Sequence, residues 1–243
     1  TDGSGTLSWT ANSGSGASNV TGLSDALIES NSMYIGNDPS GTTSTAEYNL
    51  AVGTTALDAI TTGDKNTGVG YNALTGVTSG SWNTAVGHEA GKAMTTGADN
   101  TAIGLSAGAA ITTGTRNIAI GGVALDNVDS ENDNLAIGYA ALGGAIDGGE
   151  LNVAIGNYSL DALTTGDRNV GVGYMSLSAN TTGYYNTATG VNALKRNTTG
   201  YLNVAMGESS LDANTTGNQN VAIGTYSLTS NTTAGGNTAI GSY

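Results

Sequence analysis

Residues 100–121 read NTAIGLSAGAAITTGTRNIAIG, and the stretch starts to repeat itself after 17 residues. The same spacing continues in both directions: an asparagine recurs every 17 residues, with one interval of 18, and a glycine follows each asparagine by four residues. The asparagines that open the repeats are Asn49, Asn66, Asn83, Asn100, Asn117, Asn134, Asn152, Asn169, Asn186, Asn203, Asn220 and Asn237. A fixed period of this length is the sequence signature of a solenoid, in which each repeat forms one coil.

We number the positions of each repeat from its asparagine, which is position 0. Asparagine, a small residue and glycine stand at positions 0, 2 and 4, whereas positions 1 and 3 mostly carry Thr, Val, Leu or Ile. Alternation with a period of two is typical of a β-strand with two different faces. No stretch shows the sustained period of 3.6 that an amphipathic helix requires. The sequence therefore predicts a strand at positions 0 to 4, and we expect a second short strand at positions 6 to 11.

The predicted fold is an all-β parallel β-solenoid, or β-roll, in which equivalent residues of successive coils stack about 4.8 Å apart. Residues 32–243 form this repeat domain of about 13 coils. Its pattern is irregular at 126–151, where an acid-rich stretch and a one-residue insertion fall. Residues 1–31 lie outside the register, and we expect them to form a lead-in and cap with one helical turn over residues 24–29.

The recurring polar residues are interpreted as structural. A buried asparagine in register with those above and below it can satisfy its amide along a ladder, and glycine permits a positive φ at a corner. In the central coils this role falls to Asn100, Asn117, Asn134, Asn152, Gly104, Gly121, Gly138 and Gly156. Position 11 is apolar in the first half of the chain and becomes asparagine in the second half, at Asn180, Asn197, Asn214 and Asn231. An apolar column should therefore give way to a second polar ladder.

The composition excludes several classes of function. The 243 residues include 19 Asp and Glu but only 6 Lys and Arg, which gives a formal net charge of −13. A surface this negative repels nucleic acids and anionic membranes. The chain has no cysteine for a disulfide or a thiolate metal site. No apolar run approaches the roughly 18 residues of a membrane-spanning helix, so neither nucleic-acid binding nor membrane insertion is expected.

One short motif resembles a catalytic signature, but the repeat explains it. Residues 104–108 match G-x-S-x-G, and the single histidine, His88, lies about one coil earlier. A nucleophile elbow requires a turn from a strand into a helix, whereas Gly104 is the repeat glycine of its coil. The sequence therefore predicts no catalytic residue and no enzymatic activity.

Four carboxylates lie within eight residues of the irregular region: Asp126, Asp129, Glu131 and Asp133. Calcium accepts oxygen ligands from flexible loops, so these residues are the candidate metal ligands. The stretch lacks the loop glycine and the distal bidentate glutamate of an EF-hand. A solvated acidic loop is therefore favoured over a Ca²⁺ site, and no cofactor is expected.

Tyr184, Tyr185 and Tyr201 are the candidate receptor-binding residues. Tyr184 and Tyr201 share position 15 on consecutive coils, and Tyr185 stands beside them. A further set shares position 5, namely Tyr71, Tyr139 and Tyr174. Exposed tyrosines on a rigid array can stack against sugar rings, since one end of the side chain is apolar and the other is polar. Tyrosines that fill grooves between subunits are the alternative.

Adjacent threonines at positions 12 and 13 suggest an ice-binding surface, because regular arrays of hydroxyl and methyl groups can order water. Adjacent residues of an extended chain point to opposite sides, however, whereas a Thr-x-Thr spacing would place both side chains on one face. A single-chain solenoid that binds ice or glycans remains an alternative reading of the repeats.

The units NTAIG at 100–104 and NVAIG at 220–224 resemble the head repeats of trimeric autotransporter adhesins of the YadA type. The fuller unit, with LSDAL at 23–27 and YIGNDPS at 34–40, resembles repeats of tail-fibre and other structural proteins of marine bacteriophages, cyanophages included. The resemblance covers about residues 21–243 and implies a left-handed parallel β-roll that assembles as a homotrimer. The period of 17 departs from the period of about 14 in the adhesins.

This resemblance implies a non-enzymatic fibre protein of a phage virion, which serves as a rigid spacer and presents a contact surface to a receptor on the host bacterium. Its partners would be copies of itself, other virion proteins and the receptor, and its location would be extracellular, on the virion. The head domain of a bacterial surface adhesin is the alternative. The residues also favour a trimer, because three coils that present position 3 to a common axis would bury a continuous apolar stripe.

Overall fold

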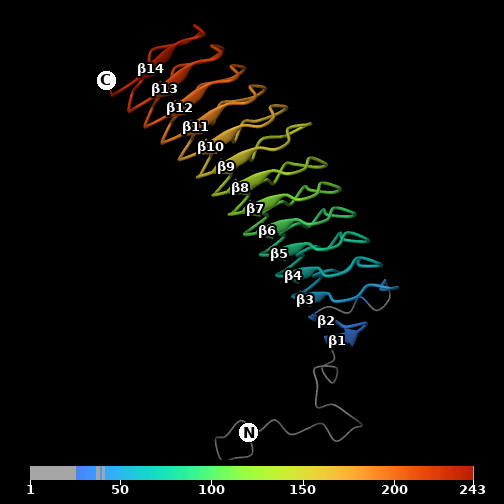
Figure 1. Cartoon of the computed structure of the whole chain (residues 1–243). Coiled ribbons are helices and arrows are strands. Elements are labelled where there is room, and N and C mark those ends of the chain that lie inside the picture. Colours follow the sequence, from blue (N-terminus) through green and yellow to red (C-terminus); the bar gives the residue numbers. More distant parts are fainter. Residues whose placement is uncertain (1–25, 37–38, 40–41, 243) are drawn as a thin grey trace, which may run out of the picture.

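The computed structural model describes residues 26–36, 39 and 42–242, which form one stack of coils (Figure 1). The strands are β1 (Ala26–Glu29), β2 (Ser32–Ile35), β3 (Leu50–Val52), β4 (Thr67–Val69), β5 (Thr84–Val86), β6 (Thr101–Ile103), β7 (Ile118–Ile120), β8 (Leu135–Ile137), β9 (Val153–Ile155), β10 (Val170–Val172), β11 (Thr187–Thr189), β12 (Val204–Met206), β13 (Val221–Ile223) and β14 (Thr238–Ile240). No α-helix occurs in these ranges. The predicted all-β solenoid with 17-residue coils is confirmed.

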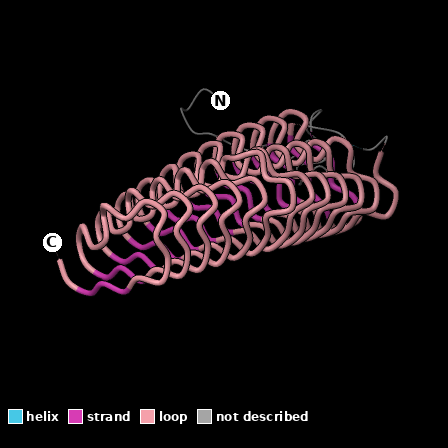
Figure 2. The backbone as a smooth tube through the Cα atoms, turned by 90° about the horizontal axis from the view of Figure 1, so that it is seen from above, coloured by secondary structure: helices cyan, strands magenta, loops and turns pink. Residues whose placement is uncertain are grey.

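The strands belong to one sheet in which they follow their order in the chain. Every neighbouring pair from β2 to β14 is parallel, and equivalent positions of the repeat face one another, as Ala102 faces Ala119 between β6 and β7. Figure 2 shows the strands following one another along one side of the coils, while loops and turns form the rest of each coil. Each coil thus contributes one rung to the sheet.

The expectation of a second strand at positions 6 to 11 is wrong. Positions 6 and 8 adopt left-handed backbone conformations, as at Thr55 with φ 58° and Leu57 with φ 54°. A left-handed residue reverses the course of an extended chain, so these positions form consecutive turns. Hydrogen bonds between coils continue through the turns, and the Leu57 N–H donates to the Ala73 carbonyl over 3.1 Å.

The expected helical turn at residues 24–29 is also wrong where the structure describes it. Ala26–Glu29 is a strand that pairs antiparallel with β2. Ser30 and Asn31 connect the two strands with φ values of 45° and 60°, as a tight hairpin turn requires. A strand satisfies the unpaired N–H and C=O groups of β2 more completely than a helical turn would. The predicted lead-in at residues 1–25 lies outside the described residues.

The core lies inside the coils and is more apolar than expected from Asn, Ala and Gly alone. Side chains at positions 0, 2, 7, 8 and 11 point inward, as do those of Asn66, Ala73, Leu74 and Val77 in one coil. Position 8 supplies a column of fully buried leucines at Leu57, Leu74, Leu125, Leu142, Leu160, Leu177, Leu194 and Leu211. Each coil therefore buries bulky side chains of its own, without a partner chain.

The position 0 asparagines form a continuous ladder of hydrogen bonds. The backbone N–H of Asn100 donates to Asn83 Oδ1 over 3.1 Å, and Asn100 Nδ2 donates to the Gly114 carbonyl over 2.8 Å. Asn100 Oδ1 in turn accepts from the backbone N–H of Asn117 at 2.9 Å. The amide of each buried asparagine thus links its own coil to both neighbours, which avoids the cost of burying an unpaired polar group.

Position 11 changes from an apolar column to a second asparagine ladder in the C-terminal half. Ile60, Val77 and Met94 are fully buried in the first coils. Further along the chain, Asn197 Nδ2 donates to Asn180 Oδ1 over 2.8 Å and to the Gly200 carbonyl over 2.8 Å. The two halves of the rod therefore have the same backbone but different interiors.

The coil that begins at Asn134 absorbs the inserted residue without interrupting the ladder. Asn134 Nδ2 donates to the carbonyl of Gly149, 15 residues away rather than the usual 14. Ile146 is buried at the place of position 11, and Ala145 before it is exposed. The backbone N–H of Asn152 still donates to Asn134 Oδ1 over 3.0 Å. The extra residue is thus accommodated at the surface of the loop.

The repeat glycines allow coils to approach closely. Position 4 glycines from Gly53 onward have φ between 126° and 141°, and a Cβ on Gly156 would lie 2.5 Å from the Gly173 carbonyl oxygen. No L-residue side chain fits between two backbones at this distance. Glycine is therefore required at position 4 by both the backbone conformation and the spacing of the coils.

Gly171 replaces the usual alanine at position 2, and we expect Gly171→Ala to destabilise the fold by about 1 kcal/mol through overpacking. A Cβ at residue 171 would lie 2.5 Å from Ser159 Oγ, which hydrogen-bonds the Gly171 carbonyl over 3.0 Å. In a background with both Ser159→Ala and Ser176→Ala, which removes the hydroxyls 2.5 and 3.0 Å from that Cβ, the same change should instead stabilise the strand by about 0.5 kcal/mol. Urea denaturation of the four proteins measures the coupling, and equal effects in both backgrounds would contradict the clash.

Candidate functional surface

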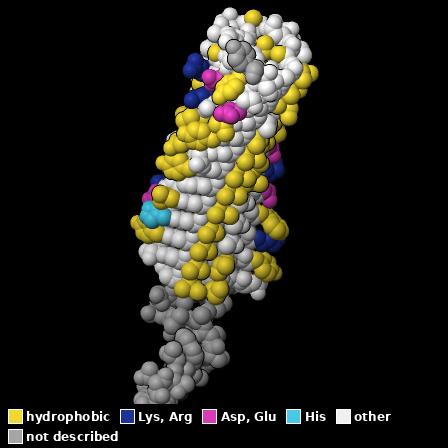
Figure 3. Space-filling model, turned by 90° about the vertical axis from the view of Figure 1, so that its left-hand side faces the viewer, with side chains coloured by type: hydrophobic (Ala, Val, Ile, Leu, Met, Phe, Trp, Pro, Cys, Tyr) yellow, Lys and Arg dark blue, Asp and Glu magenta, His cyan; other side chains and the backbone are white. Residues whose placement is uncertain are grey.

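The outward face of the sheet is a long uncharged surface of the rod. Its side chains come from positions 1 and 3 of β3 to β14, and we call it the strand face. Every strand-face residue is Leu, Ile, Val, Met or Thr. Because the position 2 side chain points into the core, those at positions 1 and 3 must point outward. Figure 3 shows the resulting stripe of hydrophobic side chains along the length of the molecule.

The strand face is exposed in the single chain. Val86 and Ile103 are each 38% exposed, and most other strand-face side chains are half-buried by their neighbours in the sheet. Twelve rungs of three residues cover about 58 Å by 10 Å, or on the order of 600 Å². Monomeric proteins rarely expose a contiguous apolar patch larger than about 300–600 Å². A surface of this size and composition is typical of an interaction site.

Charged and aromatic side chains line one border of the strand face, at positions 15 and 16, which we call the position-16 rim. Lys65 Nζ lies 4.1 Å from the centre of the Trp82 ring. Arg116 donates two hydrogen bonds to the carboxylate of Asp133, at 2.6 and 2.7 Å. These bonds hold the pKa of Asp133 below its usual value. Cations on this rim are thus paired within the chain.

The tyrosines singled out from the sequence do come together on the position-16 rim. The rings of Tyr184 and Tyr201 are stacked with centres 4.8 Å apart and an angle of 2° between their planes. Tyr185 contacts Tyr184 edge-on at 5.8 Å, and the guanidinium of Arg168 lies 5.4 Å from the Tyr185 ring. Each of the two stacked rings therefore has one face covered by the other, which removes that face from sugar stacking.

The opposite border of the strand face, at positions 5 and 6, carries a different aromatic group; we call this border the position-5 rim. Tyr139, Tyr158 and Tyr174 lie on three consecutive coils with edge-to-face ring contacts. Further toward the N-terminus, the Tyr71 ring contacts His88 at 5.0 Å. Tyr158 stands at position 6, so a comparison of position 5 among the repeats does not find it. A comparison of positions 5 and 6 together does.

The four candidate metal ligands are not brought together. Arg116 pairs with Asp133, Thr112 Oγ1 donates to Asp129, and Glu131 accepts hydrogen bonds from the backbone N–H groups of Asp129, Ser130 and Gly148. Burial raises the pKa of Asp126. Among residues 26–36, 39 and 42–242, no group of three or more His, Cys, Asp or Glu side chains could hold a metal ion. The acidic residues are separated because each occupies a different position of the coil.

The two threonines of each pair use their hydroxyl groups differently, so only position 13 forms a column of exposed threonines. At position 12 the hydroxyl is used inside the stack, since Thr61 Oγ1 donates to the Thr78 carbonyl over 2.9 Å and Thr181 Oγ1 to the Thr198 carbonyl over 3.1 Å. At position 13 the threonines are exposed, as Thr182 is. The two neighbours thus have different environments, as expected for adjacent residues.

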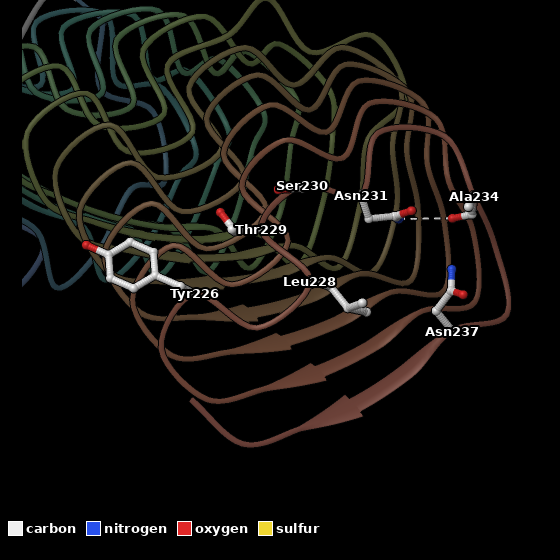
Figure 4. Close-up of a pocket in the computed structure, with 7 residues that line it drawn as sticks. All are labelled: Tyr226, Leu228, Thr229, Ser230, Asn231, Ala234 and Asn237. Atoms are coloured by element: carbon white, nitrogen blue, oxygen red, sulfur yellow. Dashed lines mark hydrogen bonds between the residues drawn. The ribbon is translucent and has the colours of Figure 1, made fainter. Parts of the chain in front are cut away.

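A hollow at the C-terminal end of the stack is lined by Tyr226, Leu228, Thr229, Ser230, Asn231, Ala234 and Asn237 (Figure 4). Leu228, Asn231 and Asn237 occupy positions 8, 11 and 0, which the following coil covers elsewhere in the rod. Asn231 Nδ2 donates to the Ala234 carbonyl over 3.0 Å, as equivalent asparagines do in the buried ladder. The hollow therefore consists of positions that a following coil covers elsewhere in the rod, and it is not counted as a separate binding site.

In the described part of the chain, no helix has the length and apolar character needed to cross a membrane. Comparison with known proteins gives no match to a protein-family model, a curated protein or a solved structure. The functional argument therefore depends on the surfaces described above.

Proposed function

We propose that this chain is a non-enzymatic rod of a phage fibre that assembles as a homotrimer through its strand face. The observation that carries the proposal is the strand face itself, which is uncharged over twelve consecutive coils and mostly aliphatic, with threonine at the remaining positions. The resemblance of the repeats to those of phage fibre proteins supports the virion as its location. The rod would act as a spacer, join other virion proteins and present its outer surface to a bacterial receptor.

The chemistry of the strand face favours copies of the same chain as its partner. No strand-face position of β3 to β14 carries a charged residue, so packing strand faces together buries no charge from these positions. In a trimer each chain divides this area of about 600 Å² between two neighbours, so each interface is smaller than the roughly 800 Å² that each partner contributes to a standard one. Burial of this apolar area would stabilise the assembly by the hydrophobic effect.

Rotational symmetry about an axis parallel to the rod suits this surface. In such an assembly equivalent coils lie at the same height, and a flat strand face of constant width can contact its neighbours along its whole length. The exposed threonines of position 13 would remain on the outside of the trimer.

The mass of the full chain in solution tests this proposal. We expect light scattering after size exclusion to give three times the 23.9 kDa of one chain, and electron microscopy to show a rod about 60 Å long. A monomer at tens of micromolar would contradict the trimer. That result would favour the alternative of a single-chain solenoid whose strand face contacts ice or a glycan directly.

A further inference from the structure

Three tyrosines on the position-5 rim form a continuous aromatic surface, in which Tyr139 and Tyr174 are exposed and Tyr158 is half-buried. Tyr139, Tyr158 and Tyr174 follow strands β8, β9 and β10. The ring of Tyr158 lies 5.6 Å from that of Tyr139 and 6.2 Å from that of Tyr174, with angles of 73° and 86° between the planes. The outer two rings are 51% and 45% exposed. They are two coils, or about 10 Å, apart along the rod.

The three tyrosines of the position-5 rim do not cover one another's ring faces in the way that the stacked pair on the position-16 rim does. The edge-to-face contacts with Tyr158 turn neighbouring rings across one another, whereas Tyr184 and Tyr201 lie parallel and cover each other. Tyr139 also rests against the backbone of Gly122, where a Cβ would lie 3.4 Å from the ring. The rigid coil below and the neighbouring tyrosine hold these rings in place before any ligand binds.

A planar amide lies between the two outer rings. Asn157 occupies position 5 on the coil between those of Tyr139 and Tyr174, and its side chain is exposed. Its Oδ1 accepts a hydrogen bond from the backbone N–H of Tyr139 over 2.8 Å. This bond uses Oδ1, and Nδ2 of the exposed side chain donates no hydrogen bond to the described part of the chain, so it is available as a donor.

The rim on either side of these residues carries no charge at positions 5 and 6. From Gly122 to Asn192, positions 5 and 6 carry only Gly, Val, Tyr, Ala, Asn and Met. A ligand recognised here therefore needs no charge, and the net charge of −13 disfavours acidic polymers. Aromatic rings with adjacent hydrogen-bonding groups suit molecules that have both apolar C–H faces and hydroxyl groups.

We propose that the Tyr139–Tyr158–Tyr174 surface binds a neutral polysaccharide chain whose sugar rings stack on the two outer tyrosines. The chain would run along the rod and contact both rings, and Asn157 Nδ2 would donate a hydrogen bond to a sugar hydroxyl between them. This proposal rests on the receptor contact in the proposed function and assigns it to the position-5 rim. It takes the place of Tyr184, Tyr185 and Tyr201 as the sugar-stacking site.

Titration calorimetry of the full chain tests the site, with three neutral hexasaccharides as probes: maltohexaose, cellohexaose and laminarihexaose. We expect at least one to bind saturably, and Tyr139→Ala and Tyr174→Ala each to weaken that binding about tenfold. Tyr139→Phe keeps the ring and should stay within about twofold of the unchanged protein. Tyr184→Ala is the matched control on the other rim and should also stay within about twofold.

Two results would overturn the inference: no saturable binding of any of the three probes, or binding that neither alanine variant weakens. Polygalacturonate serves as the acidic comparison, and binding of this polymer in preference to all neutral probes would equally count against the site. The mass of the same samples separates this inference from the proposed function. A trimer without sugar binding rejects only the sugar site, whereas a monomer that binds sugar rejects only the assembly.

Discussion

Replacing Ile120 or Ile137 with aspartate is expected to convert the assembled protein into monomers at micromolar concentration. Both side chains occupy position 3 of the strand face, on the adjacent strands β7 and β8. In a trimer built on this face, the new carboxylate would be buried without a partner in every subunit. An uncompensated buried charge costs about 3–5 kcal/mol, and the trimer would bury one such charge in each of its three chains.

The coil itself should survive these substitutions, because positions 1 and 3 point away from the core. We expect the circular dichroism spectrum to remain that of the unchanged protein while light scattering reports the lower mass. Ile120→Thr is the conservative control, since β11 carries threonine at position 3. Thr113→Asp, on the exposed position 13, should keep the trimer. If Ile120→Asp leaves the mass unchanged, position 3 does not lie in the interface.

Asn100→Asp is expected to destabilise the fold by about 3–5 kcal/mol at neutral pH, through the loss of one ladder rung and the burial of a charge. Asn100 Nδ2 donates to Asn83 Oδ1 and to the Gly114 carbonyl, at 3.1 and 2.8 Å. An aspartate at residue 100 would place a carboxylate oxygen against these two hydrogen-bond acceptors, where the amide places a donor. Thermal denaturation followed by circular dichroism measures the loss.

The destabilisation by Asn100→Asp should depend on pH. Burial next to two acceptors raises the pKa of the new carboxyl in the folded state above its unfolded value of about 3.9. The folded protein then binds more protons than the unfolded chain, so stability falls as pH rises above about 4 and levels off above the raised pKa. A penalty that stays constant from pH 4 to pH 7 would contradict burial of the charge.

Asn218→Asp provides a matched control on the outside of a later coil, the one that begins at Asn203. Asn218 Oδ1 accepts a hydrogen bond from the backbone N–H of Tyr201 over 2.9 Å. At the same position of other coils, Asp64 and Asp167 accept the equivalent bond. The carboxylate is therefore already compatible with position 15, and we expect Asn218→Asp to change the stability by less than about 0.5 kcal/mol.

Much of the fold could be predicted because the period is carried by residues with few structural alternatives. An asparagine and a glycine at a constant spacing of four, repeated every 17 residues, require equivalent positions to stack. The alternation at positions 0 to 4 correctly located the strand in each coil. Position 11 also behaved as its residues suggested, with a buried apolar column and then an asparagine ladder.

The turns could not be predicted in the same way, because leucine and other ordinary residues adopt conformations that their types do not favour. Leu74 has a φ of 53°, which costs about 1–2 kcal/mol for an L-residue and gives no signal in the sequence. Burial of the leucine side chain and the hydrogen bonds to neighbouring coils offset this cost. Local propensity favoured a second strand, and packing between coils overrode it.

The candidate sites show the same division. The sequence identified tyrosines on consecutive coils, but only the structure shows that Tyr184 and Tyr201 stack face to face while Tyr139 and Tyr174 do not. Likewise, four carboxylates close in sequence point to different parts of the coil and bind different partners. Spacing along a chain with many turns does not determine side-chain direction, since each turn rotates the following residue.

The sequence by itself determined the order of the coils, the strand in each and the ladder that joins them, because each of these follows from a repeated residue in a repeated place. Only the tertiary structure decided which surface the rod leaves apolar, which carboxylates and cations neutralise one another and which aromatic rings stay open. Those properties depend on contacts between coils, where residues 17 or more apart in the chain lie side by side.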